Sequence, residues 1–417
     1  MTAHTKPSGF PEIRVPAAQT FAGLVLGFAV GALLRGTDTL AGILQVAEPL
    51  GKLWLQALQL TILPLVIGLV YTGISQTLAA ANGGTLARRA VTLFVIVLLF
   101  SGTMSALLVP ALLGIWPIPE GAAAALSGGT ADPGTVPGFA EILAAMMPDN
   151  IFAAATAGAM LPLVLFVALF ALAATRIAEA PRRQLALVFE GLAAAMMVMV
   201  GWVLMLAPIG VFGLAVTLGA SSGADAIKGL AHYIIVVSAA GAVVLVCGYV
   251  LALTRGGQRL GAFSRAMLPV HAVAISTQSS LAGLPAMLVA ARKLGVREST
   301  ADFALPLAVA IFRATSPAMN MGVAIYAAYL MGVPLTPAAL AAGVAVAFLV
   351  SLSSVSLPGT LSFVISVGPI AMAMGVPITP LALLVAVEML PDIMRTLGNV
   401  TLDVAVTTAV DQRSEEP

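Results

Sequence analysis

The sequence predicts an all-α membrane protein with several transmembrane helices. Of its 417 residues, 60% are hydrophobic and only 9% are charged, and the mean hydropathy is +1.06. A soluble domain, by contrast, is about half apolar and about one-quarter charged. Several apolar segments reach the roughly 20 residues that a helix needs to span the hydrocarbon core. The net charge of +1 gives no electrostatic basis for binding nucleic acid.

Six spanning helices fit the first 254 residues. The apolar segments lie near residues 18–34, 42–80, 90–115, 150–175, 185–218 and 229–254. The second and fifth segments are long enough to tilt or to break at Pro64 and Pro208. The preceding residues lack the basic region, apolar core and cleavage site of a signal peptide, so we expect the first segment to remain as a span.

The distribution of basic residues predicts the orientation. If the N-terminus is cytoplasmic, nearly all Lys and Arg residues between the spans fall inside, and the opposite connections hold only Arg35 and Lys228. Cytoplasmic connections are the ones enriched in Lys and Arg. We therefore expect a multi-pass protein of the cell inner (plasma) membrane, with cytoplasmic tails at residues 1–17 and 411–417.

Two later apolar stretches are interrupted by Ser, Gly and Pro, at residues 276–285 and 351–359. Charge balance places Arg265 and Arg292 on the same side, so the first stretch is predicted to enter the membrane and return. Exposed backbone at membrane depth is tolerated only where protein or a watery cavity covers it. Paired broken segments indicate an inverted repeat with a site between its halves. Two ordinary kinked helices are the alternative.

The densest group of charges in the C-terminal third lies inside an apolar segment. At about 100° per residue, a helix gathers its polar members within roughly 80° of one another. These members are Glu388, Asp392, Arg395, Asn399 and Asp403. Ionisable groups at this depth cost about 2.5–3.5 kcal/mol each, which favours a substrate or ion site facing the protein interior. One Arg cannot neutralise three carboxylates, so the excess negative charge indicates cations. An internally paired structural network is the alternative.

At these residues the sequence resembles the dicarboxylate/amino acid:cation symporter family, which includes the glutamate transporters. The strongest matches are residues 392–403 and the second interruption, with weaker support from residues 207–212, 148–152 and the first interruption. The resemblance extends over nearly the whole chain. It implies eight transmembrane helices, two re-entrant helical hairpins, inverted repeats and an elevator-type transporter.

The resemblance also implies two functional parts, embedded in the lipid bilayer and assembled as a homotrimer. The scaffold and trimerisation elements are residues 18–82 and 150–220. The transport domain comprises helices at 88–115 and 228–254, a first re-entrant hairpin at 262–292, a seventh helix at 303–331, a second re-entrant hairpin at 337–375 and an eighth helix at 378–410.

Residue roles follow from the resemblance and agree with side-chain chemistry. Arg395 would clamp the side-chain carboxylate of the substrate, since its planar fork matches a carboxylate in two bonds. Asp392 would bind the amino group, and Asn399 the main carboxylate. The remaining substrate-binding residues are Thr396 and the two hairpin tips, with Ser279 and Ser280 in the first and Val355, Pro358 and Gly359 in the second.

Two cation positions are implied, and no cofactor is expected beyond Na+ and/or H+ as coupling ions. One position uses Asp403 with oxygens near Asn399 and Asn320, and the other uses backbone oxygens of Ser351, Leu352 and Ser354. Oxygen ligands of this kind suit sodium.

The seventh helix departs from the family pattern Asn-Met-Asp-Gly-Thr. It contains Asn320 but no Asp, and of the third-helix positions Val97, Phe100 and Ser101 only the serine could coordinate a cation. These losses predict coupling to fewer sodium ions or to protons. Arg313, in a segment about seven residues longer than expected, is either a second anion contact or the partner of Glu388.

The leading interpretation is secondary active symport of an acidic amino acid, glutamate or aspartate, coupled to sodium and/or protons. The alternative is a C4-dicarboxylate symporter for succinate, malate or fumarate. Asp392 argues against that alternative, because its carboxylate repels a substrate without an ammonium group. An intramembrane enzyme would need a nucleophile and a base, for which Ser280 and Asp392 could be considered, but no motif supports that function. We therefore expect a transporter rather than an enzyme. A channel is the third option. His232 is interpreted as incidental.

Overall fold

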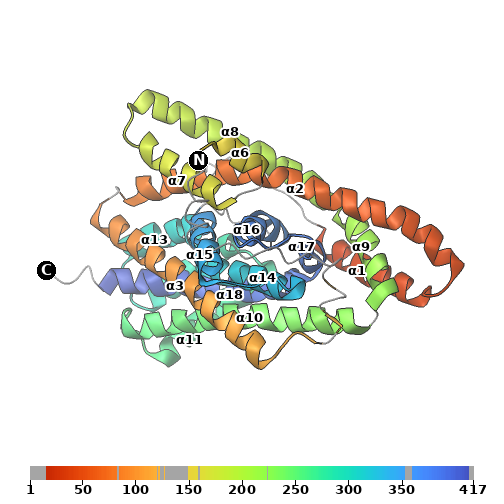
Figure 1. Ribbon diagram of the computed structural model, residues 1–417. Helices are drawn as coiled ribbons and strands as arrows, with labels where there is room; N and C mark the ends of the chain where they lie inside the picture. The colour runs from red at the N-terminus through yellow and green to blue at the C-terminus, as the bar shows by residue number, and fades with distance from the viewer. Residues whose placement is uncertain are drawn as a thin grey trace, which may run out of the picture.

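The computed structural model describes residues 16–81, 84–119, 121–122, 126, 149–157, 160–222, 224–352 and 359–412. Every regular element among these residues is helical (Figure 1), in agreement with the predicted all-α class. Four of the helices are long and apolar enough to cross a membrane. They are α2 (Asp38–Ala81), α3 (Thr85–Ile115), α8 (Glu179–Met205) and α10 (Ala224–Thr254). The chain is therefore an integral membrane protein.

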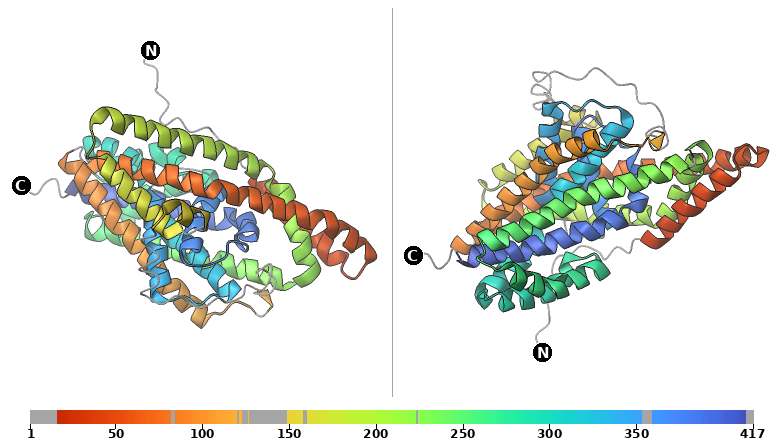
Figure 2. Two further views of the ribbon diagram at one scale, coloured as in Figure 1. Left: turned by 45° about the horizontal axis from the view of Figure 1, so that its top comes forward. Right: turned by 90° about the horizontal axis from the view of Figure 1, so that it is seen from below.

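One group of helices, which we call the α2 group, packs mainly through apolar side chains. It contains α2, α8, α1 (Ala17–Leu33), α7 (Met160–Ala174) and α9 (Ala207–Ser222). A short helix, α6 (Ile151–Thr156), precedes α7. Helix α2 runs beside α8, and α1 lies along α9 (Figures 1 and 2). The approach of α1 to α9 requires Gly23, because a Cβ at this position would lie 2.5 Å from the carbonyl oxygen of Pro208.

The two prolines considered as break points behave differently. The fifth predicted span breaks before Pro208, because α8 ends at Met205 and α9 begins at Ala207. Helix α2, in contrast, continues through both Pro49 and Pro64.

A second group, the α18 group, surrounds the C-terminal helix α18 (Met389–Gln412). Helix α10 runs beside α18 (Figure 2), and α14 (Ser316–Met331) packs against α3 and α10. Every described side chain of α18 from Asn399 to Asp411 is buried. The polar residues in this part of the helix are therefore enclosed by protein, as their sequence pattern predicts.

Two helical hairpins belong to the α18 group. The first joins α11 (Leu260–Thr277) to α12 (Ser280–Lys293) through Gln278, whose φ of 50° is left-handed. The second joins α15 (Pro337–Leu352) to α16 (Gly359–Ala373), with residues 353–358 outside the described part of the chain. The sequence prediction places the two hairpins at residues 262–292 and 337–375. That these hairpins re-enter the membrane stays a prediction.

The prediction of one continuous seventh helix at 303–331 is wrong. Helix α13 (Glu298–Ile311) ends, residues 312–315 are non-helical, and α14 begins at Ser316. We call residues 312–315 the break segment. The cause is Pro317, which has no N–H to donate and whose ring clashes with the carbonyl four residues earlier. The carbonyl of Arg313 instead accepts from the N–H of Ser316 at 3.0 Å.

The predicted eighth helix at 378–410 also begins later than expected. Residues before it form a single turn, α17 (Leu381–Leu384), and a 3-10 turn at Val385–Val387, and α18 begins at Met389. Pro391 fits the first turn of α18, where its missing N–H leaves no helical hydrogen bond unmade.

Candidate functional site

The guanidinium of Arg395 is the centre of the candidate site. Only 1% of the Arg395 side chain is exposed. Its Nη1 donates to Oδ1 of Asp392 at 2.9 Å, and its Nη2 lies 2.5 Å from Oε1 of Glu388. The Tyr233 hydroxyl from α10 donates to the other oxygen of Glu388 at 3.0 Å. Buried charges need both ionic partners and hydrogen bonds, and this cluster supplies them.

The helical spacing of α18 explains this cluster. Asp392 and Arg395 are three residues apart, and residues at this spacing are neighbours on a helix surface. Glu388 lies one residue before the helix begins, and its side chain also contacts Arg395. The alternative in which Arg313 balances Glu388 is wrong, because Arg395 takes that role.

Asn399 is held by the break segment. The backbone N–H of Thr315 donates to Oδ1 of Asn399 at 2.9 Å, and the Thr315 hydroxyl lies 2.6 Å from the same oxygen. That hydroxyl also lies 2.7 Å from the carbonyl oxygen of Arg395. Nδ2 of Asn399 is buried and has no hydrogen-bond partner among the described residues. Asn399 is therefore oriented with its amide donor available for a carboxylate.

Gly398 allows this close contact between the break segment and α18. A Cβ at Gly398 would overlap Cγ2 of Thr315. Since overlap of this kind forces side chains or backbone to shift, glycine is the residue that fits here.

The other predicted substrate residue on α18, Thr396, bonds within its own helix. Its hydroxyl donates to the carbonyl oxygen of Asp392 at 3.0 Å. The hydroxyl oxygen keeps its acceptor capacity, so its role toward a substrate stays a prediction.

The tip of the first hairpin lies at the N-terminal end of α18. Nε2 of Gln278 donates to the carbonyl oxygen of Met389 at 3.1 Å. Ser279 caps α12 by accepting from the N–H of Ala282 at 3.3 Å, and Ser280 is buried in the first turn. The first tip thus contacts Met389, the residue that follows Glu388 in the sequence. Of the second tip, Ser354, Val355 and Pro358 lie outside the described residues, and Gly359 begins α16.

Asp403 is the most isolated charge in α18. The residue is completely buried, and neither carboxylate oxygen has a hydrogen-bond partner among the described residues. An uncompensated buried carboxylate is costly, so the site calls for a positive charge. Arg313 from the break segment lies within electrostatic range of Asp403 and of Asp392.

The other predicted cation ligands have different surroundings. Oδ1 of Asn320 accepts from Nη2 of Arg395 at 3.4 Å, and a neighbouring guanidinium disfavours a second cation there. The hydroxyl of Ser101 donates to the carbonyl of Ala314 at 2.6 Å, whereas Phe100 is 52% exposed. Ser351 and Leu352 are buried, and the Ser351 hydroxyl has no partner within the described part of the chain. Cation binding by these residues stays a prediction.

Three residues that support the site were not identified from the sequence. Tyr233 and Thr315 act through contacts between distant segments, and neither residue type gives a local signal. His232 is buried, with Nδ1 3.0 Å from the Tyr326 hydroxyl and Nε2 3.1 Å from the carbonyl oxygen of Trp116. His232 thus connects α10 to α14 and to Trp116, the residue after α3, and its role in this structure is to hold these elements together.

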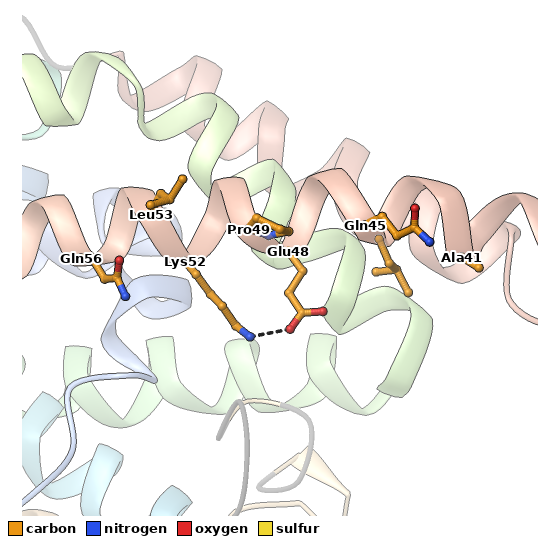
Figure 3. Close-up of a pocket in the computed structure, with 8 residues that line it drawn as sticks. Ala41, Gln45, Glu48, Pro49, Lys52, Leu53 and Gln56 are labelled. Carbon is orange, nitrogen blue, oxygen red and sulfur yellow. Dashed lines mark hydrogen bonds and ion pairs between the residues drawn. The ribbon is translucent and has the colours of Figure 1, made fainter.

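A surface hollow on the α2 group is a separate feature. It lies along one face of α2 and includes an exposed ion pair between Lys52 and Glu48 at 2.6 Å (Figure 3). Its lining contains no residue of α14 or α18. Exposed pairs contribute little, so this hollow is no rival to the buried site.

Comparison with known proteins defines the class. The model of the sodium:dicarboxylate symporter family matches residues 17–413, so the chain belongs to this family. The resemblance inferred from residues 392–403 is thereby confirmed.

Individual relatives cover most of the chain. The proton/sodium-glutamate symport protein of Bacillus subtilis (strain 168) is 28% identical over 396 residues, which is 92% of this chain and 89% of the relative. C4-dicarboxylate transport protein 2 of Ralstonia nicotianae is 26% identical over 405 residues, covering 94% and 87%. The proton/glutamate-aspartate symporter of Escherichia coli (strain K12) is 25% identical over 338 residues, covering 77% and 75%.

Proposed function

We propose that the protein is a secondary active symporter that takes up an acidic amino acid, glutamate or aspartate, together with sodium ions, protons or both. The observation that carries this proposal is the buried row of Asp392, Arg395 and Asn399 on one helix. Each residue offers a group suited to one part of such a substrate. Relatives named for glutamate and aspartate symport support the same substrate class.

The substrate contacts are assigned by charge. The guanidinium of Arg395 binds the side-chain carboxylate through two donors. One is its Nε–H, which has no hydrogen-bond partner among the described residues, and the other is the Nη2 group that contacts Glu388. Asp392 binds the ammonium group. Nδ2 of Asn399 donates to the main carboxylate. The hairpin tips, with Ser279 and Ser280 in the first and Val355, Pro358 and Gly359 in the second, close over the bound molecule, and Thr396 lies between these contacts.

A C4-dicarboxylate such as succinate, malate or fumarate is the second candidate. Several relatives are named C4-dicarboxylate transport proteins, and Arg395 would serve either substrate. Asp392 separates the two candidates, because a dicarboxylate has no ammonium to offset its charge. The amino acid is the better fit.

The two helix groups suggest how transport occurs. We assign the α2 group, with α6, to the scaffold and the α18 group to a mobile transport domain that moves as an elevator. This assignment follows the packing of the helices. In the α2 group, α1 packs on α9 and α2 packs on α8. In the α18 group, α10 packs on α18 and α3 packs on α14. In this arrangement eight helices span the inner membrane, both hairpins are re-entrant, both termini are cytoplasmic and three chains form a trimer.

Coupling arises if cation and substrate each favour the closed state of the hairpins. Each then raises the apparent affinity for the other by the same factor. The main candidate for a bound cation is the end of α15, at Ser351, Leu352 and Ser354. Asp403 also needs a positive charge, which either a cation or a side chain of the protein can supply.

Uptake into proteoliposomes tests this function. The purified protein is supplied with labelled aspartate, glutamate or succinate under separately imposed sodium and proton gradients, and protein-free liposomes are the control. Concentrative uptake that collapses when the gradient is removed supports symport. Passive flux would indicate a channel, and chemical conversion of the substrate would indicate an enzyme.

A further inference from the structure

The break segment brings a permanent positive charge into the core of the α18 group. Arg313 is only 8% exposed, although it lies between two helices rather than inside one. A guanidinium is not deprotonated in proteins, so this position carries a full charge. Burial of that charge requires an anionic partner.

Three residues fix the position of the break segment through their contacts. The Thr315 hydroxyl and N–H bind Asn399, and the Ala314 carbonyl accepts from Ser101 of α3. The Phe312 ring stacks on Phe94 of α3, with ring centroids 4.4 Å apart. These contacts flank Arg313 on both sides in the sequence. Its place in the core is therefore set by the surrounding structure.

The same segment packs against the part of α18 that contains Asp403. Phe312 and Ala314 share an apolar cluster with Leu402 and Val406, which bracket Asp403. The end of α15 joins this cluster through Leu352. Arg313 and Asp403 thus enter one packed region from two different elements, and they lie within electrostatic range of each other.

Charge counting shows what Arg313 contributes. Among the described residues, the buried charged side chains are Arg313, Glu388, Asp392, Arg395, Asp403 and Asp411. Asp411 pairs with the partly exposed Arg297. Arg395 contacts Glu388 and Asp392. Arg313 lies within electrostatic range of Asp392 and of Asp403, and among the described residues it is the charged side chain that acts on Asp403. Counted with Arg297, these side chains carry four negative and three positive charges. The missing positive charge could come from the ammonium group of a substrate or from one small cation.

We propose that the guanidinium of Arg313 acts as a tethered cation for Asp403, so that the transporter binds no free coupling ion at this carboxylate. This proposal rests on the proposed function and specifies one carboxylate at which no coupling ion binds. A relative with a neutral residue in place of Arg313 would need one further sodium ion or proton in each cycle. Arg313 is thus a residue that sets the coupling stoichiometry.

The test compares cation dependence in Arg313→Met with that in the wild type. Uptake of labelled aspartate is measured in proteoliposomes over a range of sodium concentrations at several pH values. We expect the variant to gain dependence on one further cation, with the Hill coefficient for sodium or for protons rising by about one. Arg313→Lys, which keeps the charge, should show the wild-type order.

A binding measurement provides a second readout. Sodium should raise the melting temperature of Arg313→Met more than that of the wild type, because a ligand that binds the folded state stabilises it. The double variant Arg313→Met with Asp403→Asn removes both charges and should return to the wild-type cation order. If the single variant does not fold, recovery of folding in the double variant supports the pairing, and no recovery overturns it.

Results that contradict the role of Arg313 differ from results that contradict the proposed function. An Arg313→Met variant with an unchanged cation order overturns the tethered cation. If the Arg313→Met variant needs a higher substrate concentration for half-maximal uptake but keeps the wild-type cation order, Arg313 is a second anion contact instead. Absence of uptake by the wild type for aspartate, glutamate and succinate would refute the proposed symport itself.

Discussion

The α2 group and the α18 group bury very different side chains. In the described residues of the α2 group, the buried polar side chains are four threonines, and no charged side chain is buried. Three of these threonines, Thr20, Thr72 and Thr77, donate to carbonyls one turn earlier in their own helices or at the helix start. The α18 group buries two guanidiniums and four carboxylates.

This difference separates two physical tasks. The α2 group is apolar and close-packed, so substitutions there act on stability. The α18 group retains buried charges that an apolar core would avoid, since desolvation of each charge is costly. Such a cost is expected where charges bind a ligand. Variants in the two groups should therefore fail in different ways.

The largest effect is expected for Arg395→Ala. Loss of the guanidinium removes the carboxylate clamp, and uptake of aspartate should fall by at least about 100-fold. Glu388 and Asp392 are left without their partner, which costs about 3–5 kcal/mol of stability. Uptake is therefore normalised to folded protein, measured by size-exclusion chromatography in detergent.

Arg297→Ala is the matched control for charge removal. Arg297 pairs with Asp411 at 2.8 Å, but its side chain is 45% exposed. Its loss should change uptake by less than about 3-fold, because partly exposed pairs contribute little. Equal losses in the two variants would mean that Arg395 has no special role.

Asp392→Asn should separate the candidate substrates. The ammonium group loses a charged partner, so aspartate uptake should fall by about 10- to 100-fold. Succinate has no ammonium, and its uptake should be kept or improved relative to aspartate. The measurement is competition between the two labelled substrates in one preparation. Parallel losses would contradict the assignment of Asp392.

Gly398→Ala should reduce both stability and uptake. The added methyl overlaps Thr315, which forces the break segment away from α18 and releases Asn399. We expect a cost of about 1–3 kcal/mol and a clear loss of uptake. Gly191→Ala in α8 is the matched control, because no atom lies within 4 Å of the added Cβ. A Gly398→Ala variant as stable and active as Gly191→Ala would exclude the close contact.

The smallest effect on transport is expected in the α2 group. Nε1 of Trp54 donates to the carbonyl oxygen of Val203 at 2.9 Å, so Trp54→Phe loses one hydrogen bond. The expected cost is about 0.5–1.5 kcal/mol, detected as a lower melting temperature. Uptake per folded protein should not change. A change in substrate preference would contradict the view that the α2 group contributes to stability and the α18 group to substrate binding.

The sequence predicts the charged stripe because its signal is local. The period of one helix places Asp392, Arg395, Asn399 and Asp403 on one side, and the surrounding apolar residues require that side to face protein. The structure buries all four residues. Hairpin bounds are also predictable, since Ser, Gly and Pro interrupt an otherwise apolar pattern.

The break segment shows where local signals end. Apolar residues continue from α13 through Phe312, so the pattern gives no sign that the helix stops. Pro317 is the available signal, but its position alone does not show which turn unwinds. Because the break lies near Asn399, Thr315 joins the predicted Asn320 at the site. Partners such as Tyr233 depend on tertiary packing and cannot be read from one segment.

A structure with bound aspartate tests the central claim most directly. We predict that the guanidinium of Arg395 lies within about 2.7–2.9 Å of the substrate side-chain carboxylate, with Asp392 at the ammonium group and Nδ2 of Asn399 at the main carboxylate. Aspartate bound away from α18, with Arg395 still bound to Glu388, Asp392 and Asn320, would contradict the account.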